Sequence, residues 1–327
     1  RVPDLPRAEG SRTGSGEVID GFDEGIAPAL TGAAAPAAPA DAPLIGIIGG
    51  SGLLQLAGLE DVHRKVVRTP WGQPSGALSF GRLGGVPVVF LARHGYGHTI
   101  APHDINYRAN IWALHEAGVS QVIACSAVGG IRADLTPGQL VVPDQIVDYT
   151  WGRAVSYFSG EDQPVVHIDF SHPFDARLRH QLIGAALRLN LPVADTGCYG
   201  CTQGPRLETL AEVRRYQGDG CDMLGMTAMP EAALARELDL PYAILGVVAN
   251  RAAGLAPGAD ATLAQRSEPS TPPERIVPDV AIAQANGGGA AQPQDDLALR
   301  IAGTLTDAMP RLMDVLTQTV RQLGGVA

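Results

Sequence analysis

Two apolar runs that each end in a polar or glycine-rich corner constrain this chain more than any other feature. Residues 88–92 are apolar and are followed at once by Arg93 and His94. Residues 122–125 are also apolar, and they lead into the corner SAVGG at residues 126–130. Short apolar runs bounded in this way predict two buried strands, each ending at residues that can contact a ligand.

A helix is predicted between the two runs. Asp104 is expected to cap this helix and Gly118 to close it. A strand, a helix and a second strand in this order predict a βαβ-like unit with its ligand site at the strand ends. Strands and helices alternate through most of the chain, so the expected fold class is α/β: a single-domain mixed twisted β-sheet surrounded by helices.

The chain divides into one folded domain and two irregular segments. Residues 1–43 are rich in Gly, Ala, Pro and acidic residues, which predicts a disordered extension. Residues 44–327 are expected to form the domain, interrupted at 255–294 by a Pro-, Gly- and Ala-rich stretch that predicts a flexible insertion. Apolar residues at helical spacing over 297–323 predict a terminal amphipathic helix.

Charge and composition exclude several classes of protein. A net charge of −10 argues against a nucleic-acid partner, whose phosphates need a basic face. No apolar run approaches the ~20 residues that span a bilayer, so no membrane contact is expected. Four cysteines in 327 residues do not suggest a disulfide scaffold. We expect a soluble, cytoplasmic protein with a sizeable core.

A glycine-rich turn follows the first predicted strand, residues 44–48. Glycines at 49, 50 and 52 let backbone N–H groups approach an anion, and Ser51 adds a hydroxyl donor. Arg93 suits bidentate contact with phosphate oxygens, so a small dianion is a candidate ligand. From the residues alone, a turn without a ligand and a surface ion pair remain alternatives. For His98 and His103 a structural role is the prediction.

Two other motifs suggest metal or redox chemistry. His167, Asp169 and His172 lie in one predicted loop, and Cys198 and Cys201 have C-x-x-C spacing. No second cysteine pair completes a zinc site, and the cysteines fall on a predicted strand. We predict no metal and inert, buried thiols, with an oxidisable pair as the alternative.

Three long motifs together resemble the nucleoside phosphorylase family. They are GIIGGSGL at 46–53, the stretch 93–130, and GMTAMPEAALARE at 225–237. The chain looks most like the trimeric branch that includes methylthioadenosine, methylthioinosine and purine nucleoside phosphorylases. The resemblance runs from about residue 44 to 254 and resumes near 295.

The resemblance implies a phosphorolysis site with inorganic phosphate as co-substrate, no other cofactor and no metal. It assigns the phosphate to Ser51, Arg93, His94, Ser126, Ala127 and Thr227. It assigns further substrate contacts to Met226, Leu207 and Phe170, the last as an aromatic that reaches a neighbouring subunit's sugar site. It also implies a homotrimer and places the stretch 255–294 at a lid.

The resemblance marks two polar residues as catalytic, and these two residues predict which purine base the protein prefers. The leaving purine gains negative charge, so a donor at N7 and O6 lowers the barrier and an acceptor suits N1–H. Asn250 supplies such a donor and Glu208 such an acceptor, which matches the 6-oxopurine enzymes. The adenine-preferring branch has Ser and acidic residues instead. Ordinary helix-start and strand-end polar residues remain the alternative reading of this pair.

The group at the 5′ carbon of the sugar is the second feature that distinguishes the candidate substrates. Oxopurine nucleoside enzymes place a histidine beyond the Asn to bind the 5′-hydroxyl, and here no histidine follows His180. An apolar 5′ group is therefore favoured, and the predicted reaction is phosphorolysis of S-methyl-5′-thioinosine. The alternatives are a phosphorylase for inosine and guanosine, a methylthioadenosine phosphorylase, and a non-catalytic nucleoside-binding protein.

Overall fold

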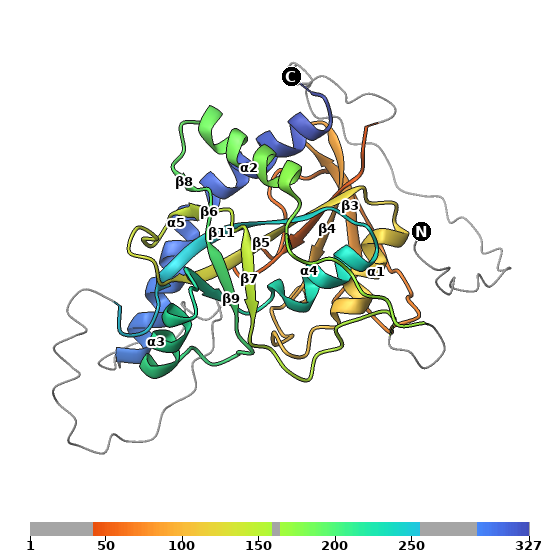
Figure 1. The fold of residues 1–327 in the computed structure, drawn as a ribbon. Coiled ribbons are helices and arrows are strands. Elements are labelled where there is room, and N and C mark those ends of the chain that lie inside the picture. The colour runs from red at the N-terminus through yellow and green to blue at the C-terminus, as the bar shows by residue number, and fades with distance from the viewer. Residues whose placement is uncertain (1–41, 159–163, 256–292, 327) are drawn as a thin grey trace, which may run out of the picture.

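A computed structural model describes residues 42–158, 164–255 and 293–326 of the chain. Figure 1 shows the whole fold. The extension predicted over residues 1–43 and the insertion predicted over 255–294 lie almost wholly outside these ranges, so both remain predictions.

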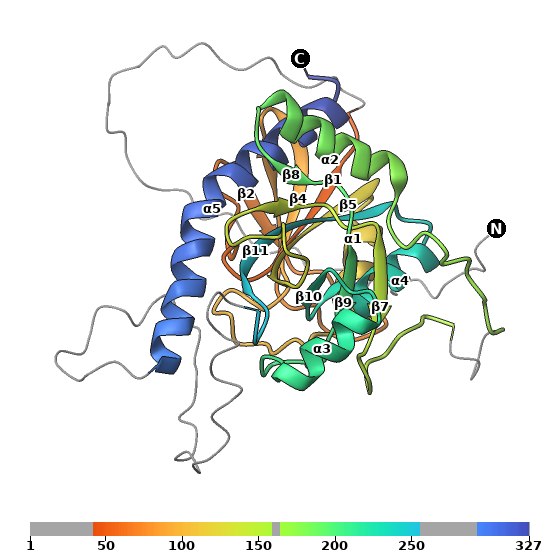
Figure 2. The same ribbon diagram turned by 60° about the vertical axis from the view of Figure 1, so that its left-hand side comes forward.

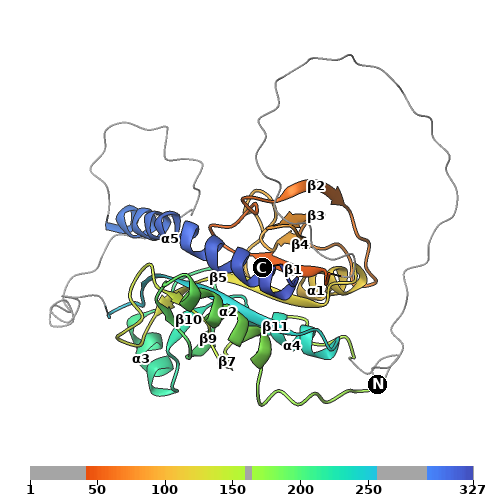
Figure 3. The same ribbon diagram turned by 90° about the horizontal axis from the view of Figure 1, so that it is seen from above.

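An eleven-stranded sheet forms the centre of the molecule. Its main path runs β2-β3-β4-β1-β5-β10-β9-β7. Off this path, β11 pairs with β5 and with β6, and β6 pairs with β8. Figure 3 shows the first four strands of this path and the last three on opposite sides of β5 and β11. The strands are β1 Ile45–Gly49, β2 Glu60–Lys65, β3 Leu78–Leu83, β4 Val86–Ala92, β5 Gln121–Gly130, β6 Leu140–Val141, β7 Gln145–Asp148, β8 Val193–Ala194, β9 Cys198–Cys201, β10 Met223–Gly225 and β11 Tyr242–Arg251.

Helices cover both faces of the sheet. They are α1 Tyr107–Glu116, α2 Ala176–Arg188, α3 Leu210–Gly218, α4 Ala228–Glu237 and α5 Pro293–Leu323. On one face α1 contacts α4, and on the other α2 contacts α5, as Figures 1 and 2 show. Ile47 packs into the core beneath α5, and its neighbour Ile48 into the core beneath α1 and α4. Burial on both faces explains why β1 is apolar without alternation, and the expected α/β class is confirmed.

β5 is longer than the sequence predicts. The expected end at Cys125 is wrong, because β11 pairs with β5 in parallel from Val122 as far as Gly130. On its other edge β5 pairs with β1 up to Ala124 and with β10 only from Gly129 onward. Within the described residues, Cys125–Val128 therefore has no strand partner on that edge. We call this stretch the sheet gap.

The start of α1 also differs from the prediction. Asn106, and not Asp104, is the N-cap: its side chain accepts a hydrogen bond from the Ala109 N–H. The Asn106 amide also donates to the Trp71 carbonyl at 2.7 Å, so a loop distant in the chain helps to hold this cap. Gly118 has a φ of +81° just past the helix, which confirms it as the closing residue.

The terminal amphipathic helix is confirmed as α5. Its apolar stripe packs on β11 and α2, with Leu305, Leu312, Leu316 and Val320 buried. Across the described ranges no helix is both long enough and apolar enough to cross a bilayer. The cytoplasmic location remains a prediction.

Candidate functional site

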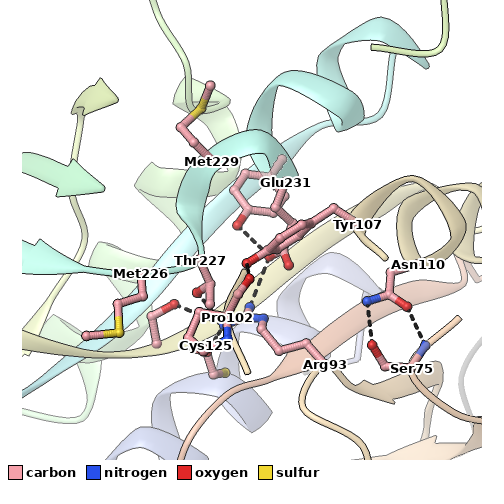
Figure 4. Close-up of polar contacts among 12 residues, drawn as sticks. Ser75, Arg93, Pro102, Tyr107, Asn110, Cys125, Met226, Thr227, Met229 and Glu231 are labelled. Carbon is pink, nitrogen blue, oxygen red and sulfur yellow. Dashed lines mark hydrogen bonds and ion pairs between the residues drawn. The ribbon is translucent and has the colours of Figure 1, made fainter. Parts of the chain in front are cut away.

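Arg93 brings three elements together at the sheet gap. It follows the end of β4, and its side chain is only 1% exposed. Its Nη1 donates to the Cys125 carbonyl at 3.1 Å, to Ser126 Oγ at 3.3 Å and to Thr227 Oγ1 at 3.0 Å. Figure 4 shows the guanidinium between Cys125 and Thr227. The gap is thus filled by a cation and two hydroxyls rather than by a strand.

A buried carboxylate lies on the other side of the guanidinium. Glu231 of α4 is fully buried, and its Oε1 accepts from Arg93 Nη2 at 3.0 Å and from Tyr242 Oη at 2.8 Å. Burial raises the pKa of the Glu231 carboxyl, and the Arg93 charge and the Tyr242 hydroxyl oppose that rise by favouring the ionised form. Sequence reasoning missed Glu231. Its one signal is an acidic residue four places after Thr227 within an otherwise apolar stretch, residues 228–235.

Two histidines connect the cation to the glycine turn. His94 Nδ1 lies 2.8 Å from the Ile100 carbonyl, which can only accept, so Nδ1 carries the proton. Burial, and then the neighbouring Arg93 charge, lower the pKa of His94 to about 4, so the ring is neutral at physiological pH. The His98 ring packs 4.6 Å from the His94 ring, and its Nε2 lies 3.1 Å from Ser51 Oγ. Ser51 therefore joins the same network.

The glycine turn approaches Arg93 too closely for any side chain. A Cβ at Gly50 would lie 2.6 Å from the Cys125 carbonyl oxygen and 3.0 Å from Arg93 Nη1. Any larger residue would displace the turn that carries Ser51. The close approach explains why glycine stands at this position.

A small hollow lies beside these groups. One wall consists of predicted phosphate residues, Ser51, Ser126 and Ala127, and the other of apolar side chains of α5, Leu305, Met309 and Leu312. All six residues predicted to bind phosphate thus belong to one connected cluster or line its hollow. Their binding of phosphate remains a prediction.

Glu208 approaches the far end of the gap from the β10 side. Its Oε1 accepts from Thr202 Oγ1 at 2.8 Å, and the Thr202 N–H donates to the Gly225 carbonyl at 2.8 Å. Gly204 packs directly against the Met226 side chain, where a Cβ would collide with its sulfur. The loop carrying Glu208 is therefore held against the end of β10 and next to Met226.

Asn250 approaches from the β11 side. The register of β11 on β5 shifts between Val248 and Asn250, which then pairs with Gly129. A Cβ at Gly129 would lie 3.8 Å from Asn250 Oδ1, so the amide sits over this glycine. Its Nδ2 donates to the Arg251 carbonyl at 2.8 Å. Glu208 and Asn250 thus flank the end of β5 from opposite sides.

Two predicted substrate contacts, Leu207 and Phe170, lie in loops outside the Arg93 cluster. Leu207 is 42% exposed in the loop before α3. Phe170 lies in the predicted loop and packs, partly buried, against the core beneath α1 and α4. Their contacts with substrate remain predictions.

Arg153 is a second residue that sequence reasoning missed. It is 9% exposed and donates to groups from three separate segments, namely Tyr107 Oη and the carbonyls of Thr202, Gln203, Met226 and Met229. It therefore ties the Glu208 loop to the start of α4. No local motif marks it, because its partners are all distant in the chain.

The cysteines do not form the pair that their spacing suggests. All four are free. Cys198 and Cys201 lie on β9 as predicted, and the thiol of Cys198 hydrogen bonds to Cys221. Burial raises the pKa of the Cys201 thiol to about 12, in agreement with an inert side chain. In the described part of the chain no three His, Cys, Asp or Glu residues are grouped as metal ligands.

Comparison with known proteins gives consistent matches. The family model described as the phosphorylase superfamily matches residues 44–269. A probable S-methyl-5′-thioinosine phosphorylase of Xylella fastidiosa is 50% identical over 221 residues, covering 68% of this chain and 93% of that protein. A 6-oxopurine nucleoside phosphorylase of Pyrococcus furiosus is 47% identical over 218 residues, covering 65% and 81%. The structure of methylthioadenosine phosphorylase from Schistosoma mansoni with adenine aligns with a TM-score of 0.73 at 28% identity, covering 86% and 92%.

Proposed function

The chain belongs to the phosphorylase superfamily, and from that premise we propose that it phosphorolyses 6-oxopurine nucleosides with a methylthio group at the 5′ carbon. In the proposed reaction phosphate attacks C1′ of S-methyl-5′-thioinosine. The products are hypoxanthine and S-methyl-5-thioribose 1-phosphate. The 50% identity to a probable S-methyl-5′-thioinosine phosphorylase supports the substrate, and the geometry supports it independently.

The observation that carries the proposal is an acceptor and a donor on the two sides of the β5 end. The Glu208 carboxylate can accept from N1–H of a 6-oxopurine, and the Asn250 amide can donate to N7 and O6. Negative charge develops on the purine as the glycosidic bond breaks, so a donor at N7 stabilises the transition state more than the ground state. An adenine ring has no N1–H at neutral pH for Glu208 to accept.

The anion end supplies positioning and charge rather than a covalent nucleophile. Arg93 and the hydroxyls of Ser126 and Thr227 face the sheet gap, and Ser51 lines the hollow together with Ser126. A phosphate there would lie on one side of a sugar whose base lies toward Glu208 and Asn250. Holding both reactants in this order accounts for the catalysis we propose.

The 5′ end of the sugar favours an apolar substituent. No histidine follows His180 in the sequence, and the α5 wall of the hollow consists of Leu305, Met309 and Leu312. A 5′-hydroxyl placed against these side chains would lose its hydrogen bonds to water without replacement. A methylthio group would not.

The test is base release from three nucleosides. S-Methyl-5′-thioinosine, inosine and S-methyl-5′-thioadenosine are incubated with the protein, with and without phosphate, and free base is separated by chromatography. We expect phosphate-dependent hypoxanthine release, fastest from the methylthio nucleoside. Faster release from inosine would favour a general 6-oxopurine phosphorylase. Adenine release alone would overturn the roles of Glu208 and Asn250, and no base from any substrate would favour a binding protein.

We also propose that the active form is a homotrimer. Large apolar side chains are exposed on the segments either side of residues 159–163, namely Trp151, Val155 and Val165. Val165 precedes by five residues Phe170, the aromatic predicted to reach a neighbouring sugar site. Light scattering after size-exclusion chromatography tests this: a mass three times the 34.0 kDa of one chain is expected, and a monomer would remove the proposed role of Phe170.

A further inference from the structure

We propose that Glu231 and Tyr242 are positioning residues that hold Arg93 in the orientation in which it binds phosphate. This inference rests on the proposed function, because it assigns the two residues a part in phosphate affinity. Neither residue is expected to touch substrate. Both act through the guanidinium.

The geometry fixes the guanidinium from the side away from the gap. Arg93 comes from the end of β4, Glu231 from α4 and Tyr242 from the start of β11. Nη2 is bound by Glu231 Oε1 at 3.0 Å, and Nη1 points at the two hydroxyls of the gap. Figure 4 shows the contacts of the Arg93 guanidinium with Glu231 and Thr227. Rotating the guanidinium about its axis would break both sets of bonds.

The ion pair is end-on rather than bidentate. Within the described residues, Arg93 Nε and Glu231 Oε2 have no hydrogen-bond partner although both atoms are buried. A side-on pair would join Nε and Nη2 to both oxygens and satisfy all four atoms. Here Oε1 takes two donors and Oε2 takes none. The arrangement therefore leaves the Nε–H donor of Arg93 uncommitted.

Tyr242 fixes the position of the Glu231 oxygen that binds Arg93. Burial raises the pKa of the Tyr242 hydroxyl well above its usual value, so it remains a protonated donor. Its hydrogen bond at 2.8 Å draws charge from the same oxygen that binds Arg93. Without that donor, Glu231 Oε1 would be held less firmly, the guanidinium that it orients would be less well placed, and phosphate would bind more weakly.

Glu237 provides a matched control on the same helix. It is also a buried carboxylate, at 7% exposure, with two hydrogen bonds. Its oxygens accept from Ser156 Oγ at 2.7 Å and from the Tyr157 N–H at 2.8 Å. Glu237→Gln therefore removes a buried charge from α4 at a place remote from Arg93.

The experiment measures KM for phosphate and for the nucleoside in Tyr242→Phe, Glu231→Gln and Glu237→Gln. We expect the phosphate KM to rise about threefold to tenfold in Tyr242→Phe, because a buried hydrogen bond to a charged group is lost. We expect it to rise more than about tenfold in Glu231→Gln, because a neutral amide replaces the carboxylate that pairs with Arg93. The nucleoside KM should change by less than about twofold in both. In Glu237→Gln, both constants should stay within about twofold. In an Arg93→Lys background, Glu231→Gln should add little further change.

Each outcome decides the inference. An unchanged phosphate KM in folded Tyr242→Phe and Glu231→Gln would overturn it, and so would an equal rise in Glu237→Gln. Should Glu231→Gln fail to fold, Tyr242→Phe decides alone. Calorimetry with inorganic phosphate separates the two levels of proposal. If the wild type binds phosphate and releases base, and the variants bind phosphate equally well, only the positioning role is overturned. If the wild type neither binds phosphate nor releases base, the proposed function is overturned as well.

Discussion

The two ends of the site are built differently. At the anion end, Arg93, Ser126 and Thr227 are buried and bonded to one another across three elements. At the base end, Glu208 and Asn250 are half-buried and bond to groups of their own neighbourhood. The anion end is therefore part of the core and rigid by packing. The base end lies at loop and strand termini, where a change of side chain alters selectivity without cost to the fold.

Replacing Arg93 tests the anion end with the largest expected effect. Arg93→Lys keeps the charge opposite Glu231 but loses the planar fork that reaches Ser126 and Thr227. We expect kcat/KM for phosphate to fall on the order of 10³-fold, with nucleoside binding retained. Steady-state kinetics with each substrate varied in turn measure this. A fall of less than tenfold would show that the hydroxyls alone hold the anion.

Acid should destabilise the anion end more than the base end. The pKa of His94 is lowered from 6.5 to about 4 in the folded chain, first by burial, so the unfolded chain takes up the proton first as the pH falls. Stability should therefore fall between pH 6.5 and pH 4, by at most about 3 kcal/mol. Urea unfolding at pH 7 and pH 5 measures it. The variant His94→Gln has no imidazole to titrate, so its free energy of unfolding should fall less between pH 7 and pH 5. An identical fall would exclude His94 as the cause.

Removing the Asn250 donor at the base end should lower activity less than Arg93→Lys does. Asn250→Ala should lower kcat/KM by ~10²-fold, chiefly in kcat, because the amide stabilises the departing base. Asn250→Asp turns a donor into an acceptor, so the preference for a 6-oxopurine over a 6-aminopurine should narrow or reverse. Parallel assays with the methylthio derivatives of inosine and adenosine measure both. An unchanged rate in Asn250→Ala would remove this residue from the site.

Of the four predictions, the substitution Glu208→Gln is expected to have the smallest effect. Glu208→Gln can still accept from Thr202, so the loop should keep its place, while the acceptor for N1–H loses its charge. We expect roughly tenfold weaker kcat/KM for the 6-oxopurine nucleoside and little change in the phosphate KM. If the phosphate KM rises as well, the two ends are not independent and the comparison between them fails.

Much of the fold was predictable because local patterns agree with it. Apolar runs buried on both faces predicted β1 and β4, and the periodicity of the last segment predicted α5. The extent of β5 was not predictable from Ser126–Gly130 alone, because small residues and glycines are turn formers unless a neighbouring strand pairs with them. That neighbour, β11, lies more than a hundred residues away in the chain. The predicted cap of α1 was wrong, and the cap that is present, Asn106, also bonds to the distant Trp71 carbonyl.

The site divides in a similar way. The six predicted phosphate residues were found through long motifs, and the structure brings them into one cluster. Glu231 and Arg153 were missed because each is defined by partners from other segments: Arg93 and Tyr242 for the first, and four carbonyls for the second. A single sequence carries no record of such contacts. Burial of an ion pair becomes visible only once the sheet is assembled.

The exchange of partners along β5 has a geometric consequence. One edge of this strand belongs first to β1 and then to β10, and Ser126 and Gly129 lie three residues apart within it. At about 3.3 Å per residue, they are separated by roughly 10 Å, a span in which a pentose ring can lie. In the proposed complex, the spacing between the phosphate and the base is therefore set along one continuous backbone. Loops around the pocket can diverge freely while that measure stays the same.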